Sequence, residues 1–305
     1  MLATGILAVT VLILGPGDLS YVDTVSGATR TMPLPGFGAA VFVAPDGRAI
    51  VPSVSEDATW VLAEGREVER WSGRLMPMFF DEPDRLWALL PGELVLLSYP
   101  ERLPLRRQGA KGLADVRAAG VSRDGRLVAA VTGGGEAELW LVVGDTQTVR
   151  RVPLPGPASS VAVAAEAELV AAGLETGGVV LVAPELPGLP RRIETPGAVV
   201  ALGFDGDRKT LLVGCRTGTG GVVVGVRPEL RPDRPAKELF RIPLKLPPSQ
   251  LAVVGKQVLV LCGDRLLVLG RGGRTLEREL EAPGARGMAV LPAEVRSVLP
   301  AWSDR

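Results

Sequence analysis

Short apolar runs separated by tight polar turns recur along the whole chain. Two copies are clear: residues 41–51 are interrupted by a turn containing Asp46-Gly47, and residues 120–131 by a turn containing Asp124-Gly125. Asp-Gly is typical of β-hairpins whose two central residues both adopt positive φ. The pattern therefore predicts pairs of adjacent antiparallel strands, and no segment shows a long helical period.

Weaker copies of the same hairpin fill the rest of the chain. The seven turns end at residues 48, 85, 126, 168, 208, 257 and 296, which gives a period near 40. An apolar third run follows each hairpin, and a more polar fourth run, such as residues 149–155, comes next. Proline and alternating arginine suit an exposed edge strand. Four strands in about 40 residues are typical of a propeller blade.

Counting the units predicts one all-β domain, a seven-bladed β-propeller of four-stranded antiparallel blades. The N-terminal unit lacks its first strand, and residues 287–291 have the first-strand pattern, so we expect the C-terminal strand to close the ring. Residues 292–305 are expected to form a tail, although 297–302 also resemble a second strand that would compete with residues 6–11. The predicted blades are 1–35 plus 285–291, 36–73, 74–110, 111–156, 157–197, 198–248 and 249–284.

Composition narrows the possible functions. The chain has no histidine, which excludes Ser-His-Asp and Cys-His catalysis and histidine metal sites, and it has no asparagine, which excludes N-glycosylation. Its 34 basic and 34 acidic residues leave no basic surplus for nucleic acid. We expect no cofactor and no bound metal. The two cysteines, Cys215 and Cys262, end apolar runs and are expected to be buried free thiols; a redox pair is the alternative.

The N-terminal segment raises the question of export. Residues 5–14 are apolar, but the first basic residue is Arg30, so a buried strand is favoured over a signal-peptide core. No segment has the length and apolar character of a membrane span. We expect a cytoplasmic monomer; the alternative is an exported protein whose signal is missing from this start site.

The N-terminal repeat also resembles a known family. Residues 7–10, 18–27, 32–36 and 44–48 are similar to the YVTN repeat of bacterial seven-bladed propellers, with a V-x-V-I-D-T-x-T-G-like strand and turn followed by a P-D-G-R turn. The similarity is good over residues 1–52 and fair over 112–156. The resemblance implies a propeller fold and a group of surface-layer, YncE-like and interaction proteins, without a defined activity. The histidines on which similar lactonases, lyases and haem-d1 propellers depend are absent.

The candidate site lies where the first strands of the blades begin. In a propeller, the connections into these strands and those between second and third strands meet on one face around the central channel. Arginines at such a mouth can hold an anionic group through bidentate hydrogen bonds. Alternatively, Arg117 pairs with a nearby carboxylate and the others are solvated. The polar residues expected at the entry are Arg74, Asp115, Arg117, Ser159, Gln250 and Arg286.

Two classes of function remain open. The repeat and the missing catalytic residue types favour a non-enzymatic scaffold that binds another protein through this face. The alternative is a propeller that binds a small anionic ligand, or a histidine-independent enzyme, with its site at the channel mouth. A deep pocket in which Arg117, Arg286 and a carboxylate converge would favour the alternative.

Overall fold

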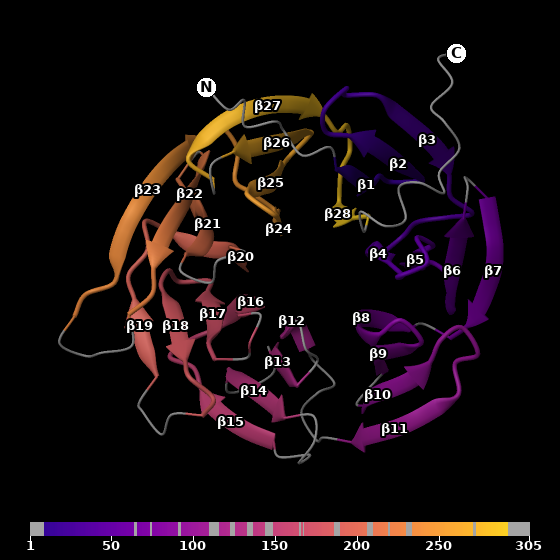
Figure 1. Ribbon diagram of the computed structural model, residues 1–305, viewed down its shortest axis with the longest axis horizontal. Coiled ribbons are helices and arrows are strands. Elements are labelled where there is room, and N and C mark those ends of the chain that lie inside the picture. Colours follow the sequence, from indigo (N-terminus) through magenta and orange to yellow (C-terminus); the bar gives the residue numbers. More distant parts are fainter. Residues whose placement is uncertain are drawn as a thin grey trace.

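The structure is a ring of β-sheets (Figure 1). This computed structural model describes residues 9–63, 66–73, 75–90, 93–109, 116–122, 126–132, 137–143, 149–164, 166, 168–185, 190–205, 210–218, 220–229, 234–270 and 273–291. Every regular element in these ranges is a strand, and the strands form seven four-stranded antiparallel sheets. The predicted seven-bladed β-propeller is therefore confirmed. The described residues contain no helix of the length and apolarity that crossing a bilayer requires.

Six blades are formed by four consecutive strands each, and the first strand of each blade is the inner one and the fourth the outer one. The strands are β4 (Phe42–Val43), β5 (Ala49–Pro52), β6 (Ala58–Ala63) and β7 (Arg66–Ser72); β8 (Met76–Glu82), β9 (Arg85–Leu90), β10 (Glu93–Ser98) and β11 (Pro104–Gly109); β12 (Val116–Val121), β13 (Leu127–Thr132), β14 (Glu138–Val143) and β15 (Val149–Pro153); β16 (Ala158–Val163), β17 (Val170–Leu174), β18 (Val179–Val182) and β19 (Arg191–Ile193); β20 (Ala198–Phe204), β21 (Leu211–Thr217), β22 (Gly220–Arg227) and β23 (Lys237–Leu244); and β24 (Gln250–Val254), β25 (Gln257–Cys262), β26 (Arg265–Gly270) and β27 (Thr275–Glu281).

The seventh blade joins the two ends of the chain. The inner strand β28 (Gly287–Val290) pairs with β1 (Thr10–Leu14), which is followed by β2 (Asp18–Asp23) and β3 (Thr29–Pro33). Figure 1 shows the yellow β28 beside the indigo β1. The Arg286 amide donates to the Leu14 carbonyl over 2.7 Å, and Met288 and Leu291 are buried. Ring closure by the C-terminal strand is therefore confirmed, whereas the predicted tail at 292–305 lies outside the described residues.

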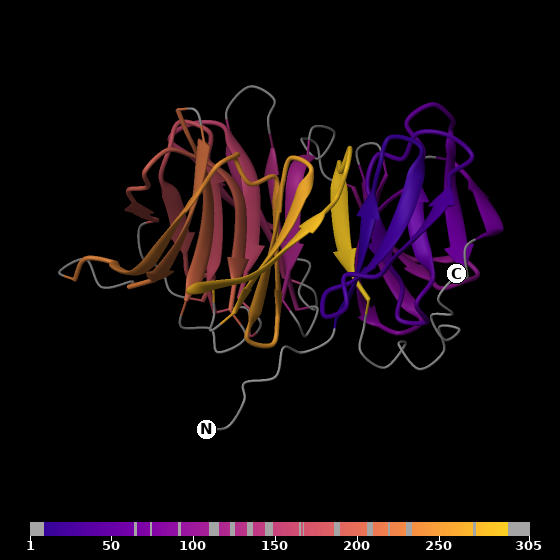
Figure 2. The same cartoon turned by 90° about the horizontal axis from the view of Figure 1, so that it is seen from above.

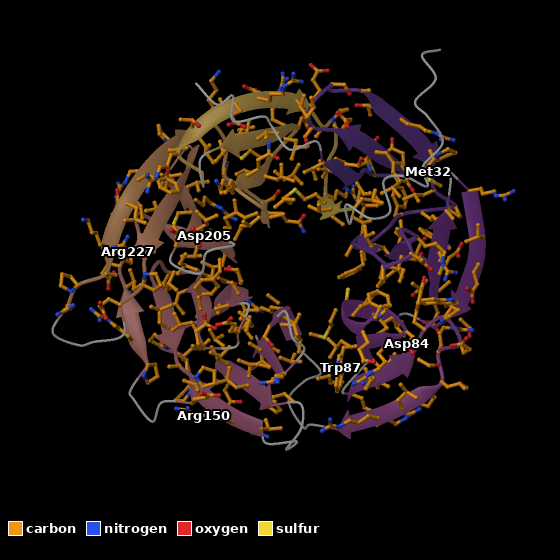
Figure 3. All side chains as sticks on the ribbon, in the orientation of Figure 1. Met32, Asp84, Trp87, Arg150, Asp205 and Arg227 are labelled. Carbon is orange, nitrogen blue, oxygen red and sulfur yellow. The ribbon has the colours of Figure 1, made fainter. Side chains whose placement is uncertain are left out.

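The core lies in layers between neighbouring blades. Because side chains alternate across a strand, one face of each sheet packs on the preceding blade and the other on the following blade. Trp60, on β6, thus packs with Leu12 and Leu14 of the closing blade, while the adjacent Val61 belongs to a cluster with Leu86 and Ala88 of the following blade. Figure 3 shows side chains filling these layers, with Arg150 and Arg227 at the outer rim of the ring.

Both cysteines belong to these layers. Cys215 and Cys262 are free and buried, as predicted. Burial raises the pKa of the Cys215 thiol to about 11 and that of Cys262 to about 12. At neutral pH both thiols are therefore protonated, which is the form that packs as a small apolar group.

The strands run between two faces of the ring, seen edge-on in Figure 2. Connections into the inner strands and between second and third strands lie on one face, which we call the loop face. Connections between first and second and between third and fourth strands lie on the other, which we call the hairpin face. This division follows from the up-and-down order of the four strands in each blade.

One expectation about the hairpin turns is wrong. In the turn between β4 and β5, Gly47 has φ of 84°, but Asp46 does not adopt positive φ. The Asp46 carboxylate accepts the Arg48 amide over 3.0 Å, and the Gly47 amide donates to the Ala44 carbonyl. This is a longer hairpin loop, in which glycine alone takes the left-handed position.

Candidate functional site

Four of the six predicted site residues can be placed on the loop face. Arg117, Ser159 and Gln250 lie at the starts of the inner strands β12, β16 and β24, and Arg286 immediately precedes β28. Arg74 and Asp115 lie outside the described residues. The inner strands β12 and β28 lie on opposite sides of the central channel (Figure 1).

The starts of four inner strands carry β-bulges at the same level. Near its start, each of β8, β12, β16 and β20 has one residue that the strand pairing skips, and β8 has a second such residue further along. A bulge leaves one residue outside the ladder and redirects its side chain. Arg117 and Ser159 are two of the residues skipped near the strand starts, and Met78 and Val200 are the other two.

Three of the predicted residues use their polar atoms to connect neighbouring blades. The Arg117 Nη1 atom lies 2.8 Å from Glu175 Oε1, on the next blade. The Ser159 hydroxyl donates to the Val199 carbonyl over 2.7 Å. Gln250 Oε1 accepts the Met288 amide over 2.6 Å, across the junction with the closing blade. The pairing of Arg117 with a nearby carboxylate matches the alternative interpretation of this residue.

Arg286 is in a different environment. Its Cζ lies 6.0 Å from the centre of the Phe37 ring, which is the geometry of a cation–π contact. Within the described part of the chain, its guanidinium forms no ion pair. Both side chains are exposed, Phe37 to 52%. An arginine and an aromatic ring are therefore presented together to solvent.

The loop that carries Phe37 is held by its backbone. The Val54 amide donates to the Phe37 carbonyl over 2.8 Å, and Val54 is itself 51% exposed. A Cβ at Gly38 would lie 2.6 Å from Val51 Cγ1, so the loop can approach the blade this closely only with glycine there. Phe37 is thus exposed on a fixed backbone and not on a long extension.

These residues define an exposed patch beside the ring closure. Pro16 belongs to the β1–β2 turn and lies against Gly284, in the same β27–β28 connection as Pro283 and Arg286, and both prolines are exposed. We call the set Pro16, Phe37, Val54, Pro283 and Arg286 the closure patch. Patches that combine aromatic, apolar and arginine side chains are typical of protein-binding surfaces.

Phe37 was missed as a candidate because only polar residues were expected at the channel entry. The signal available was its setting between Gly36 and Gly38, in a chain with only 4% aromatic residues. The described tryptophans and tyrosines are buried, which makes an exposed phenylalanine distinctive. Leu246 is also exposed on the loop face; the other exposed large apolar residues, on outer strands or leading into one, are Val68, Leu103, Leu105 and Leu276.

The described residues show no metal centre. No group of three or more aspartate, glutamate or cysteine side chains in the described ranges is arranged to hold an ion. Two carboxylates close to the closure patch already have partners: Glu56 lies 3.4 Å from Arg70 of β7, and Asp264 accepts the Gly284 amide over 2.9 Å. The closure patch therefore offers exposed apolar surface and an exposed guanidinium.

Comparisons with known proteins agree on the fold. Neither protein-family models nor curated protein sequences match the chain. Apo AztD from Citrobacter koseri is similar in structure, with a TM-score of 0.68 and 14% identity over 93% of this chain and 99% of that one. Hydrazine synthase from Kuenenia stuttgartiensis has a TM-score of 0.66 at 13% identity, covering 87% and 89%. The Cps50 (Swd1) β-propeller domain from Myceliophteria thermophila has 0.60 at 15%, covering 81% and 86%.

Proposed function

We propose that the chain is a non-enzymatic propeller scaffold that binds another protein through its loop face, centred on the closure patch. The observation that carries this proposal is the exposed Phe37 ring with the Arg286 guanidinium beside it. Hot spots of protein interfaces are enriched in arginine and in large aromatic side chains, and phenylalanine is enriched in interface cores. In this proposal the repeat of residues 1–52 places the chain among YVTN/YncE-like propellers.

The geometry of the patch suits a macromolecular partner more than a small ligand. Its residues come from four connections on the loop face, in and next to the closing blade, and all five are exposed. The free guanidinium can bind a carboxylate or a backbone carbonyl of the partner, and the ring and prolines can pack against its apolar side chains. The backbone hydrogen bonds beneath Phe37 and Arg286 reduce the ordering that binding would require.

The test is affinity capture from the native host with the wild type and the double variant Phe37→Ser/Arg286→Ala. Leu276→Ser is the matched control, because Leu276 is equally exposed, at 54%, but lies on the outer strand β27. We expect one or a few specific partners with the wild type and the control, and at least about a 30-fold loss of affinity with the double variant.

Equal partner recovery from the double variant would contradict the proposal. So would a similar loss with Leu276→Ser, because binding would then not depend on the loop face. Turnover of a small anionic substrate that disappears with Arg117→Ala would favour an enzyme at the channel mouth instead.

A further inference from the structure

A cavity of about 360 Å³ opens between the β16–β19 and β20–β23 blades, far from the closure patch. Its apolar lining comes from Ile193, Val213, Val224, Val226 and Ala236. A volume of this size is within the range of small-molecule sites, which is about 300–1,000 Å³. The lining is branched and aliphatic, so it suits a short hydrocarbon group.

The cavity exists because two neighbouring outer strands differ in length. The outer strand β19 has only three residues, whereas β23 has eight. Blades diverge towards the rim of a propeller, so the space between them must be filled by large side chains or by long outer strands. Here the small side chains of Val224 and Val226, on β22, leave part of that space open.

A β-bulge places two charged residues at the rim of this cavity. Val224 pairs with Arg241 and Val226 with Glu238, so the pairing skips Leu239. Residues three apart in a regular strand point to opposite sides, but the bulge brings Glu238 and Arg241 to the same side. Arg241 Nε donates to Glu238 Oε1 over 3.0 Å, and Nη2 donates to Oε2 over 2.7 Å. Hydrogen bonding from Arg241 lowers the pKa of Glu238.

The walls of the cavity are fixed by hydrogen bonds. The Thr195 hydroxyl accepts the Gly178 amide over 2.7 Å and donates to the Gly197 carbonyl over 2.8 Å. The Arg191 guanidinium donates to the carbonyls of Glu229 and Arg234, on either side of the β22–β23 connection. The opening is therefore formed before any ligand arrives.

One donor at the rim has no partner. Within the described residues, Nη1 of Arg241 makes no hydrogen bond, while both Glu238 oxygens already accept from Arg241. Arg241 is half-exposed, so this donor faces solvent, and a charged acceptor forms a stronger bond with a guanidinium than a neutral one does.

We propose that this cavity binds a small aliphatic monocarboxylate, with its hydrocarbon chain against Val224 and Val226 and its carboxylate on Nη1 of Arg241. The apolar lining and the free donors lie next to each other, which is the arrangement that an amphipathic anion requires. This site is separate from the closure patch, and its occupation does not depend on the proposed protein partner.

The experiment is a calorimetric titration of the full chain with butyrate, hexanoate and octanoate, and with hexanol as the uncharged probe. We expect affinity to rise about fourfold per methylene, the factor that corresponds to ~0.8 kcal/mol, until the cavity is full. Hexanol should bind at least about tenfold more weakly than hexanoate. Methyl NMR should show shifts at Val224 and Val226 and none at Val128, in another blade.

Two variants test the charged and the apolar half of the site separately, and a third is the control. Arg241→Gln should weaken hexanoate at least about tenfold, and Ala236→Trp should abolish binding by filling the opening. Arg70→Gln is the matched control, because Arg70 forms the same kind of pair with Glu67 in β7. Circular dichroism checks that each variant is folded.

Several results would overturn the proposal. These are equal affinity of hexanoate and hexanol, no dependence on chain length, full binding by folded Arg241→Gln, or an absence of shifts at Val224 and Val226.

Discussion

Two arginine–aromatic contacts on opposite faces of the ring have opposite consequences. On the hairpin face, Arg48 lies 4.9 Å from the centre of the Tyr99 ring, and Asp46 accepts hydrogen bonds from both side chains. On the loop face, Arg286 lies over Phe37 with no carboxylate between them and both side chains exposed. The Arg48–Tyr99 contact has its hydrogen-bonding partner within the fold, whereas the Arg286–Phe37 contact leaves a charge and a ring exposed to another molecule.

The hairpin-face contact also joins two blades. Asp46 belongs to the β4–β5 turn, and Tyr99 directly follows β10 and packs edge-on against Trp71 and Phe80. Burial raises the pKa of Tyr99, so its hydroxyl remains a donor. A neighbouring carboxylate and burial, more than residue type, therefore decide whether an arginine–aromatic pair stabilises the fold or is available for binding.

The largest effect is expected from deleting residues 283–305, which removes Arg286 and its supporting strand β28 together. Loss of buried Met288 and Leu291 costs about 1.5–3 kcal/mol each, and the strand edge of β1 is left open. A domain has only about 5–15 kcal/mol of stability, so we expect unfolding or aggregation. Thermal unfolding and light scattering measure this, with deletion of 297–305 as the control. An unchanged melting temperature after the longer deletion would contradict closure through β28.

A smaller loss of stability is expected from Asp46→Ala. This variant leaves the Tyr99 hydroxyl and the Arg48 guanidinium without their shared acceptor. Because Asp46 is partly exposed, we expect a loss of about 1–2 kcal/mol in the free energy of unfolding, with partner binding unchanged. Urea unfolding measures the change in stability, and affinity capture measures partner binding. A binding defect without a loss of stability would reverse the roles assigned to the two faces.

The contribution of Asp46 should depend on pH. Burial opposes its ionisation, but the hydrogen bonds and charge of Arg48, together with the Tyr99 hydrogen bond, outweigh burial and lower its pKa. A carboxylate with a lowered folded-state pKa stabilises the fold above its unfolded pKa of about 3.9, and this stability disappears as the pH falls through the folded value. The difference in melting temperature between the wild type and Asp46→Asn should therefore shrink below about pH 4. A constant difference from pH 7 to pH 3 would contradict this.

The smallest effect is expected from Arg117→Ala. The ion pair with Glu175 is exposed, and such pairs contribute about 0–1 kcal/mol, which salt reduces further. Urea unfolding of the wild type and Arg117→Ala at low and high salt measures the contribution of this ion pair. A loss above about 2 kcal/mol would mean that this blade junction depends on the pair far more than its exposure indicates.

The fold followed from the sequence because each blade repeats the same local signals. The Asp46-Gly47 turn, the apolar strands and the polar outer strands are local features, and the unpaired first-strand pattern at 287–291 predicted the closure. The site depends on contacts between blades, which local pattern does not encode. Ser159 and Gln250 were expected at the channel entry, but their partners Val199 and Met288 belong to the next blades along the ring.

Site-specific photocrosslinking in native-host extract tests most directly whether the loop face binds a protein at the closure patch. A benzophenone amino acid replaces Phe37 in one sample and Leu276, which is equally exposed on the outer rim, in another. The account predicts a covalent protein adduct from position 37 that disappears when Arg286→Ala is added, and none from position 276. No adduct from position 37, or equal adducts from both positions, would contradict it.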